Sequence, residues 1–232
     1  MSVFIISAPS GSGKSTLVTE LRKNVPGLEF SISYTTRPSR GSEQNGREYY
    51  FVTREEFERM LARDEFLEHA AVFGHYYGTH RRFQRDAEAR GHDLLLDIDV
   101  QGARQMKEKI PEAVSIFVLP PSREELEQRL RRRSEAENMR SQDVIQRRLE
   151  TATREIENYP GYDYILINDR LEQSIDALKA IVLAERLRRS AGPLGAEERE
   201  IVEAAERCRQ ARMGEQLKRV LATFALPASG RR

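Results

Sequence analysis

The feature of the sequence that most constrains the fold is the stretch SAPSGSGKST at residues 7–16, which follows the apolar run VFII. A short continuous apolar run is typical of a strand buried on both faces of a parallel sheet. Gly11 and Gly13 permit backbone turns that point successive N–H groups inward, and a helix beginning near Lys14 adds the positive end of its dipole. The stretch therefore predicts a strand, a loop that binds phosphate through main-chain atoms, and a helix.

The side chains of this loop indicate a nucleoside triphosphate. In a loop of this type Lys14 reaches the β- and γ-phosphates, and the Ser15 hydroxyl binds Mg²⁺. The usual pattern begins with glycine where this chain has Ala8, but a methyl group need not block the phosphate nest. The alternative is a simple Gly/Ser turn before a helix, and the order of strand, loop and helix argues against it. The predicted triphosphate-binding residues of the loop are Ala8, Pro9, Ser10, Gly11, Ser12, Gly13, Lys14, Ser15 and Thr16.

Further strand-like and helix-like segments alternate along the chain. The runs DLLLDID, AVSIFVL and DYILIN are buried-strand candidates, and each is followed by a helical pattern. Helix starts are indicated by capping boxes from Thr53 to Glu56 and from Ser122 to Glu125, and Gly91 marks the end of a helix that begins near His80. The alternation predicts an α/β class with a doubly wound parallel sheet.

Two stretches interrupt the alternation. Residues 33–79 contain the Tyr-rich patterns REYYFV and FLEHAAVFGHYYG, which predict a small β-rich insertion. Residues 123–150 are dominated by Arg and Glu, and their pattern fits either a solvated helical face or a functional helical segment. We predict a core formed by residues 1–32, 80–122 and 151–190, an insertion at 33–79, a helical segment at 123–150 and an extension at 191–232.

Composition limits the partners. Charged residues are 32% of the 232 residues but balance to a formal net charge of +1, so no global charge attracts the chain to nucleic acid or to a membrane. Cys208 is the single cysteine and cannot form an intramolecular disulfide, which suits a reducing cytosol. No run approaches the ~20 apolar residues of a membrane span. We therefore expect a soluble cytoplasmic protein with no nucleic-acid or membrane partner.

The insertion contains candidates for recognising the phosphate acceptor. Arg37 and Arg40, with Tyr49 as a phenol donor, are candidates for a phosphate clamp. Arginine binds phosphate through two parallel hydrogen bonds and stays charged. Glu68 and Thr79 suit guanine, since a carboxylate accepts from its N1–H and N2–H₂ groups and a hydroxyl can donate to O6. Adenine presents an acceptor at N1, and a buried mismatch of that kind discriminates by ~10⁴ or more.

The chain resembles the guanylate kinase family. The motifs that carry the resemblance are SAPSGSGKST, TTRPSRGSEQNGREYYF, FLEHAAVFGHYYGT, LLLDIDVQGA and YILIND, in the family's order, and the match covers residues 1 to about 188. The resemblance implies a P-loop NTPase-type fold with an NMP-binding insertion and a mobile helical lid. It also implies Mg²⁺-dependent transfer of the ATP γ-phosphoryl group to GMP or dGMP, which gives ADP and GDP from GMP in purine nucleotide metabolism.

The resemblance further implies roles for individual residues. The GMP site would comprise Ser33, Arg37, Arg40, Glu43, Tyr49, Glu68, Tyr77, Thr79 and Asp99. Guanine would be read by Ser33, Glu68, Thr79 and Asp99, and its phosphate would be held by Arg37, Arg40, Tyr49 and Tyr77. On the ATP side, the loop would be joined by Arg129 and by Asn168, which approaches the adenine. The residues implied in catalysis are Lys14, Arg37, Arg133 and Arg148, and Mg²⁺ would be bound by Ser15 and, through water, by Asp97.

Some residues in the insertion allow more than one interpretation. Tyr76 could act in place of Tyr77, and the resemblance favours Tyr77. His69, His75 and His80 lie close in sequence, but their spacing fits no usual zinc pattern, so we predict structural or surface roles for them.

The C-terminal region departs from the family. SAGPLG is typical of a linker, because Gly and Pro interrupt helix. Beyond it, apolar residues recur at three- and four-residue steps and predict one extra amphipathic helix with Gly214 as a weak point. Its apolar side would pack either on the protein's own core or on a second subunit, which would make a homo-oligomer. The final PASGRR is expected to be a loose tail.

Two rival functions share parts of these motifs. A guanylate-kinase-like interaction module would bind proteins without catalysis. The residues that argue against it are the intact Lys14, Ser15, Arg37, Arg40 and Asp99. A kinase acting on a ribose bisphosphate would share the loop, but it would have no use for a guanine-reading Glu68.

Overall fold

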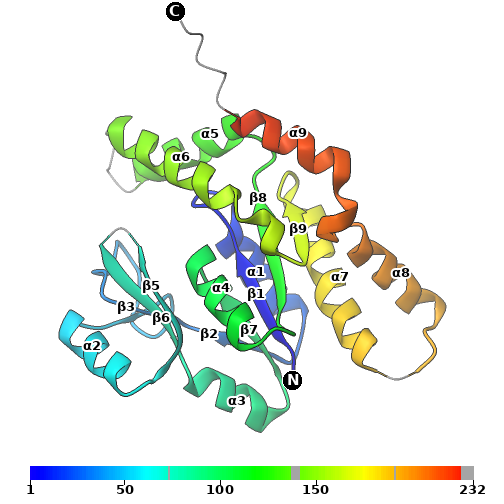
Figure 1. The fold of residues 1–232 in the computed structure, drawn as a ribbon, viewed down its shortest axis with the longest axis horizontal. Coiled ribbons are helices and arrows are strands. Elements are labelled where there is room, and N and C mark those ends of the chain that lie inside the picture. The colour runs from blue at the N-terminus through cyan, green and yellow to red at the C-terminus, as the bar shows by residue number, and fades with distance from the viewer. Residues whose placement is uncertain (73, 137–141, 191, 226–232) are drawn as a thin grey trace, which may run out of the picture. The chain divides into compact units, whose positions relative to one another are not determined.

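A computed structural model of the chain describes residues 1–72, 74–136, 142–190 and 192–225, and Figure 1 shows its helices and strands. The chain divides into two compact units. Unit 1 combines Met1–Ser7 with Arg22–Ser115, and unit 2 combines Ala8–Leu21 with Ile116–Arg232. The predicted tail PASGRR lies outside the described residues.

Unit 1 contains three parallel strands in the order β2-β7-β1. In register, Phe4 of β1 lies opposite Leu95 of β7, and Phe30 of β2 lies opposite the same residue. Every residue of β1 is buried, which confirms the prediction of a fully buried strand. The elements of this part are β1 (Val3–Ser7), β2 (Leu28–Ser31), α3 (Arg82–Arg90), β7 (Asp93–Asp97) and α4 (Val100–Lys109).

The insertion of unit 1 forms a four-stranded sheet in the order β4-β3-β6-β5, so the β-rich prediction is confirmed. β5 and β6 are antiparallel neighbours, and Phe57, Met60 and Phe66 form a small apolar core beside them. REYYFV yields a strand of only two residues. The elements are β3 (Tyr34–Thr35), β4 (Tyr50–Phe51), α2 (Arg54–Ala62), β5 (Phe66–Val72) and β6 (His75–His80).

Unit 2 begins with the predicted loop and most of α1 (Lys14–Asn24). It contains the parallel pair β8 (Val114–Leu119, whose first two residues belong to unit 1) and β9 (Tyr164–Ile167). The remaining elements are α5 (Arg123–Ala136), α6 (Gln142–Ile156), a 3₁₀ turn at Tyr159–Gly161, α7 (Leu171–Arg189), α8 (Ala196–Glu206), a 3₁₀ turn at Gln210–Arg212 and α9 (Gly214–Phe224). Among the described residues, no helix has the length and apolarity that crossing a membrane requires.

The predicted single C-terminal helix is wrong, because the structure forms two helices, α8 and α9. Between them the chain leaves α-helical conformation and pairs with β9: Ile165 N–H donates to Cys208 O at 2.8 Å, and Gln210 N–H donates to Asp163 O at 3.1 Å. Periodicity alone cannot reveal such a tertiary pairing.

The helix starts predicted at Thr53 and Ser122 and the helix end predicted at Gly91 are confirmed. Thr53 accepts the N–H of Glu56 through its side chain at 3.1 Å, and Ser122 accepts that of Glu125 at 3.2 Å. Gly91 ends α3 in the left-handed conformation, with φ of +65°.

Replacing Gly91 by Ala should lower the free energy of unfolding by about 1 kcal/mol. A methyl group there has nothing within 4 Å, so the cost comes from the left-handed backbone alone. Gly161→Ala is the matched control, since its Cβ also meets nothing within 4 Å and its φ is not in the left-handed region. Urea unfolding of both variants measures the difference, and equal midpoints would contradict the strain at Gly91.

Candidate active site

The predicted phosphate loop lies in unit 2 and has the backbone that the glycines were expected to provide. Gly11 and Gly13 have φ of +92° and +88°, which glycine alone adopts without strain. Ser12 N–H donates to Pro9 O at 3.1 Å and closes the turn, and α1 begins at Lys14. The helix N-terminus therefore follows directly on a tight, glycine-dependent turn, which is the geometry that favours phosphate.

Two side chains far along the sequence hold the outside of this turn. Asn168, buried at the end of β9, donates from Nδ2 to Ser12 O at 2.8 Å. Arg129 of α5 donates to the same carbonyl at 3.4 Å and to Asn168 O at 3.1 Å. A Cβ on Gly13 would collide with Asn168 Nδ2, so this position is restricted by packing as well as by its backbone.

The loop also contains a buried polar atom that fits an anion. Ser12 is 1% exposed, and its hydroxyl oxygen has no hydrogen-bond partner among the described residues. Ser15 is exposed at the start of α1, where its hydroxyl is available as an oxygen ligand. Mg²⁺ prefers hard oxygen ligands and usually keeps few protein ligands beside phosphate oxygens, so the residues present fit it.

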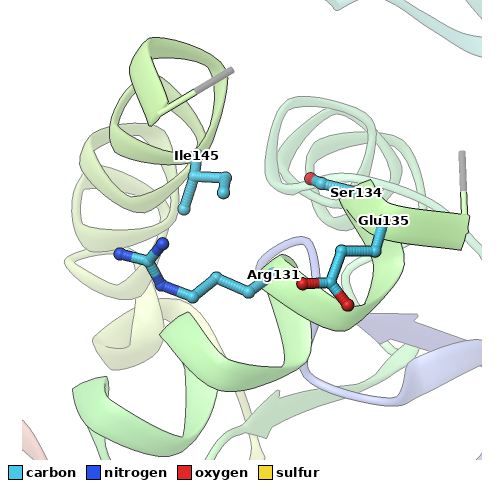
Figure 2. Close-up of a pocket in the computed structure, with 4 residues that line it drawn as sticks. All are labelled: Arg131, Ser134, Glu135 and Ile145. Atoms are coloured by element: carbon cyan, nitrogen blue, oxygen red, sulfur yellow. The ribbon is translucent and has the colours of Figure 1, made fainter. Parts of the chain in front are cut away.

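The remaining predicted donor residues lie on α5 and α6. Arg133 is exposed on α5, and Arg148 is half-buried on α6. A cavity of about 300 Å³ lies between the same two helices, lined by Arg131, Ser134, Glu135 and Ile145 (Figure 2). None of these four was predicted from the sequence to bind a substrate.

The predicted acceptor residues lie in unit 1, and Arg37 is the centre of one cluster. Arg37 is 6% exposed and donates two parallel hydrogen bonds to Glu43, at 3.0 and 2.9 Å. Glu43 also accepts the backbone N–H of Arg40 at 2.8 Å. Burial alone would raise the pKa of Glu43, but the hydrogen bonds from Arg37 and Arg40 hold that pKa below its usual value. Glu43 thus orients Arg37, a role that the sequence did not reveal.

The structure separates the two neighbouring tyrosines. The Tyr77 ring lies edge-to-face with Tyr49, with centroids 5.9 Å apart, and the Arg37 guanidinium lies 5.2 Å from the centroid of the same Tyr49 ring. The Tyr76 ring stacks on Phe57 instead, and its hydroxyl accepts from Arg54 at 2.9 Å. Tyr77 therefore joins the arginine cluster, while Tyr76 belongs to the apolar core of the insertion.

Glu68 and Thr79 form a second cluster on the paired strands β5 and β6. Glu68 is 3% exposed and Thr79 is fully buried, and the Thr79 hydroxyl donates to Glu68 Oε1 at 2.6 Å. Burial raises the pKa of Glu68 to about 7; the nearby Asp99 adds to the rise, and the hydrogen bond from Thr79 opposes it. A carboxyl group poised near neutral pH in an apolar site is a candidate for ligand recognition.

Asp99 lies at the start of α4, where Oδ1 accepts the N–H groups of Gln101 and Gly102, both at 2.9 Å. A Cβ on Gly102 would lie 2.9 Å from Glu68 Cδ and would strike its Oε2, so this helix position needs glycine. Asp97 is the last residue of β7 and is half-buried. Ser33 is also half-buried, and its backbone carbonyl accepts the N–H of Tyr50 at 2.9 Å.

Three side chains of α4 fix the strand that carries Glu68, and sequence analysis missed all of them. Gln101 donates to Ala71 O at 3.4 Å, and Gln105 donates to His69 O at 2.6 Å and accepts from His69 N at 3.3 Å.

Lys109 continues the series and donates to Leu67 O at 2.5 Å. Four helical residues span about 6 Å and two strand residues about 6.6 Å, so each successive side chain meets every second strand residue. The four-residue spacing of long polar residues is the signal that could have identified the set.

Sequence comparison relates the chain to one family of known proteins. The family model described as Guanylate kinase matches residues 1–185. A guanylate kinase of Koribacter versatilis is 61% identical over 222 residues, covering 96% of this chain and 95% of that protein. Because this match covers 96% of the chain, it includes most of the C-terminal extension. A guanylate kinase of Escherichia coli K12 is 47% identical over 190 residues, 81% of this chain and 90% of that protein.

A solved structure gives the same result for the fold. The crystal structure of guanylate kinase from Anaplasma phagocytophilum has a TM-score of 0.68 and 35% sequence identity, and the match covers 88% of this chain and 95% of that one. The predicted α/β class is confirmed by this likeness and by the parallel strands. On the family model and these identities, the chain belongs to the guanylate kinase family.

Proposed function

We propose that this protein transfers the γ-phosphoryl group of ATP to GMP, with Mg²⁺, and that its products are ADP and GDP. Phosphorylation of GMP is the activity of the family to which the chain belongs. The single observation that carries the proposal is the buried Glu68 carboxyl group beside the Thr79 hydroxyl. A cytoplasmic role in purine nucleotide metabolism follows from this activity.

The acceptor base is selected by hydrogen-bond polarity. An ionised Glu68 presents two acceptor oxygens to the N1–H and N2–H₂ donors of guanine, while Ser33, Thr79 and Asp99 complete the base site. Adenine would leave the carboxylate facing an acceptor at N1, which is costly in a buried position. The same hydrogen bonds suit dGMP, because they do not involve the ribose.

The acceptor phosphate is held by the arginine cluster. Arg37 and Arg40 would bind its oxygens, and the Tyr49 and Tyr77 hydroxyls would add neutral donors. Glu43 keeps the Arg37 guanidinium in one orientation, so less conformational freedom is lost when the phosphate binds. The charge of the clamp therefore favours a monophosphate over an uncharged nucleoside.

The donor phosphates would lie in the loop at residues 8–16. Backbone N–H groups and Lys14 would hold them, Arg129 and Asn168 would complete the ATP site, and Ser15 and, through water, Asp97 would hold Mg²⁺. When bound, Mg²⁺ neutralises charge on the donor phosphates.

The chemistry requires positioning more than proton transfer. The attacking atom is already an anionic phosphate oxygen, so no general base is needed. Repulsion between two polyanions opposes the reaction, and Lys14, Arg37, Arg133 and Arg148 would offset it while aligning the attacking and leaving oxygens. In this account residues 33–79 bind GMP, residues 123–150 form the lid, and residues 1–32, 80–122 and 151–190 form the core.

An assay of ADP formation with ATP and Mg²⁺ tests the reaction directly, with GMP, AMP, UMP and ribose 1,5-bisphosphate offered in parallel. We expect turnover with GMP, its loss in Lys14→Ala, and a fall in kcat/KM for GMP of about 10²-fold or more in Glu68→Gln. Glu68→Gln keeps the shape of the side chain but replaces one acceptor by a donor. Turnover with another acceptor, or none from a folded protein that still binds GMP, would contradict the proposal.

The raised pKa of Glu68 predicts a pH dependence. Below pH 7 the carboxyl group is increasingly protonated and offers guanine one donor and one acceptor instead of two acceptors. As the pH is lowered below 7, we expect kcat/KM for GMP to fall about tenfold for each pH unit. Above pH 7 we expect kcat/KM to stay level. Glu68→Gln is the reference, since its profile reports only the titration of the GMP phosphate. Identical profiles for the two proteins would exclude the Glu68 contribution.

Gly102→Ala tests the packing behind the base reader. The added methyl group displaces the Glu68 carboxylate, so KM for GMP should rise about tenfold while KM for ATP stays constant. Alanine favours helix over glycine by about 1 kcal/mol, so α4 should remain folded. Gly192→Ala is the control, because its Cβ meets nothing within 4 Å. An unchanged KM for GMP would show that Glu68 is not held by this contact.

A further inference from the structure

The C-terminal extension, residues 192–225, packs on its own chain. Met213, Leu217, Val220 and Phe224 are 5–7% exposed, so the apolar side of α9 is covered within unit 2. Figure 1 shows α8 beside α7 and the end of α9 beside α5. The extension therefore meets α5, which supplies Arg129 to the donor loop, and α7, which follows Asn168 in the chain.

The first connection is to β9. Residues 208–210 add an antiparallel bridge to this strand at Tyr164, with backbone hydrogen bonds at 2.8 and 3.1 Å. β9 ends at Ile167, and the next residue is Asn168, which donates to Ser12 O of the loop. The extension thus holds the start of β9, three residues before Asn168.

Ionic contacts strengthen this connection. Arg209 lies 3.0 Å from Glu185 of α7, and its guanidinium lies 4.2 Å from the centroid of the Tyr164 ring. Glu206 of α8 pairs with Arg188 of α7 and, at 3.1 Å, with Arg212. Glu185 is 13% exposed and Glu206 is 21% exposed, so these pairs are better shielded from water than isolated surface pairs.

The second connection is to α5. Thr223 of α9 accepts the backbone N–H of Arg123, the first residue of α5, at 3.0 Å, and its hydroxyl donates to Val220 O at 2.7 Å. A helix leaves its first N–H groups without intrahelical partners, so this contact caps α5 from another helix. Two residues further on, Glu125 accepts a hydrogen bond from Arg129 Nε at 2.8 Å, and Arg129 donates to Ser12 O and Asn168 O.

We propose that the C-terminal extension is a positioning element for the ATP half of the site, and that Thr223 is a positioning residue acting through α5 on Arg129. The extension holds α5 at its first residue and β9 at its start, and side chains of α5 and of the residue after β9 together hold the carbonyl of Ser12. A looser α5 would leave the loop carbonyl less well bound and the phosphate nest less preorganised. This role rests on the proposed function of the loop as the ATP site.

Thr223→Val tests this role, with Thr223→Ser as the matched control that keeps the hydroxyl. Loss of one such hydrogen bond corresponds to about a fivefold effect. We expect Thr223→Val to raise KM for ATP, and the Kd of a non-hydrolysable ATP analogue measured by calorimetry with Mg²⁺, about three- to tenfold. KM for GMP should stay constant, and Thr223→Ser should restore the ATP values.

Glu206→Gln supplies a second test that does not alter the cap. It weakens the ionic contacts to α7 and should change the ATP values in the same direction, again without changing KM for GMP. A merely structural role would lower the thermal midpoint of both variants while both KM values stay as in the unchanged protein, and this result would overturn the positioning role.

The two proposals fail in different ways. Normal turnover of the unchanged protein, with ATP-analogue Kd unaltered in Thr223→Val and Glu206→Gln, overturns the positioning role alone. Absence of ATP-analogue binding by the unchanged protein contradicts the proposed function and the positioning role together.

Discussion

Burial of the Glu68 carboxyl group is the constraint on which the acceptor half of the structure depends. A carboxylate loses hydration in such a site, and its pKa of about 7 records that cost. The surrounding structure opposes the tendency of the group to move out: Thr79 donates to it, the missing side chain of Gly102 leaves room for it, and α4 fixes the strand on either side of it. Under the proposed function, guanine would add its two donors to this buried carboxylate.

The donor half is governed by a different constraint, which is the shape of a backbone turn. Gly11 and Gly13 give the loop its left-handed residues, but the turn is held from outside through the carbonyl of Ser12. Asn168 and Arg129 reach that carbonyl from elements that are far apart in sequence. Preorganisation of this kind is most useful where the bound group is a polyanion, since the donors need not reorganise when charge develops.

Much of the fold was predictable because the deciding signals are local. Apolar runs predicted β1, β7, β8 and β9, and a glycine or a hydroxyl residue predicted particular helix ends. The single C-terminal helix was wrong for a reason of the opposite kind. The α-helix is interrupted at residues 207–213, where Cys208 and Gln210 pair with β9, and no local pattern encodes a partner more than forty residues away.

The candidate site shows the same division. Residue types at motif positions predicted Lys14, Arg37 and Glu68, because phosphate and guanine require those chemical groups. The supporting residues were not predictable in the same way. Glu43 orients Arg37, and Gln105 and Lys109 fix the strand of Glu68, through contacts whose geometry appears only after folding. Predicted roles that depend on bound nucleotides, such as those of Arg133 and Arg148, stay predictions.

ATP and GMP are proposed to bind to two separate sets of residues: the loop at 8–16 with Arg129 and Asn168 for ATP, and the Arg37 and Glu68 clusters for GMP. Calorimetric titration of Lys14→Ala and Glu68→Gln, each with GMP and with a non-hydrolysable ATP analogue plus Mg²⁺, tests it most directly. We expect Lys14→Ala to keep the GMP affinity of the unchanged protein and to lose ATP-analogue binding, and Glu68→Gln to do the reverse. Equal weakening of both ligands by either variant would contradict it.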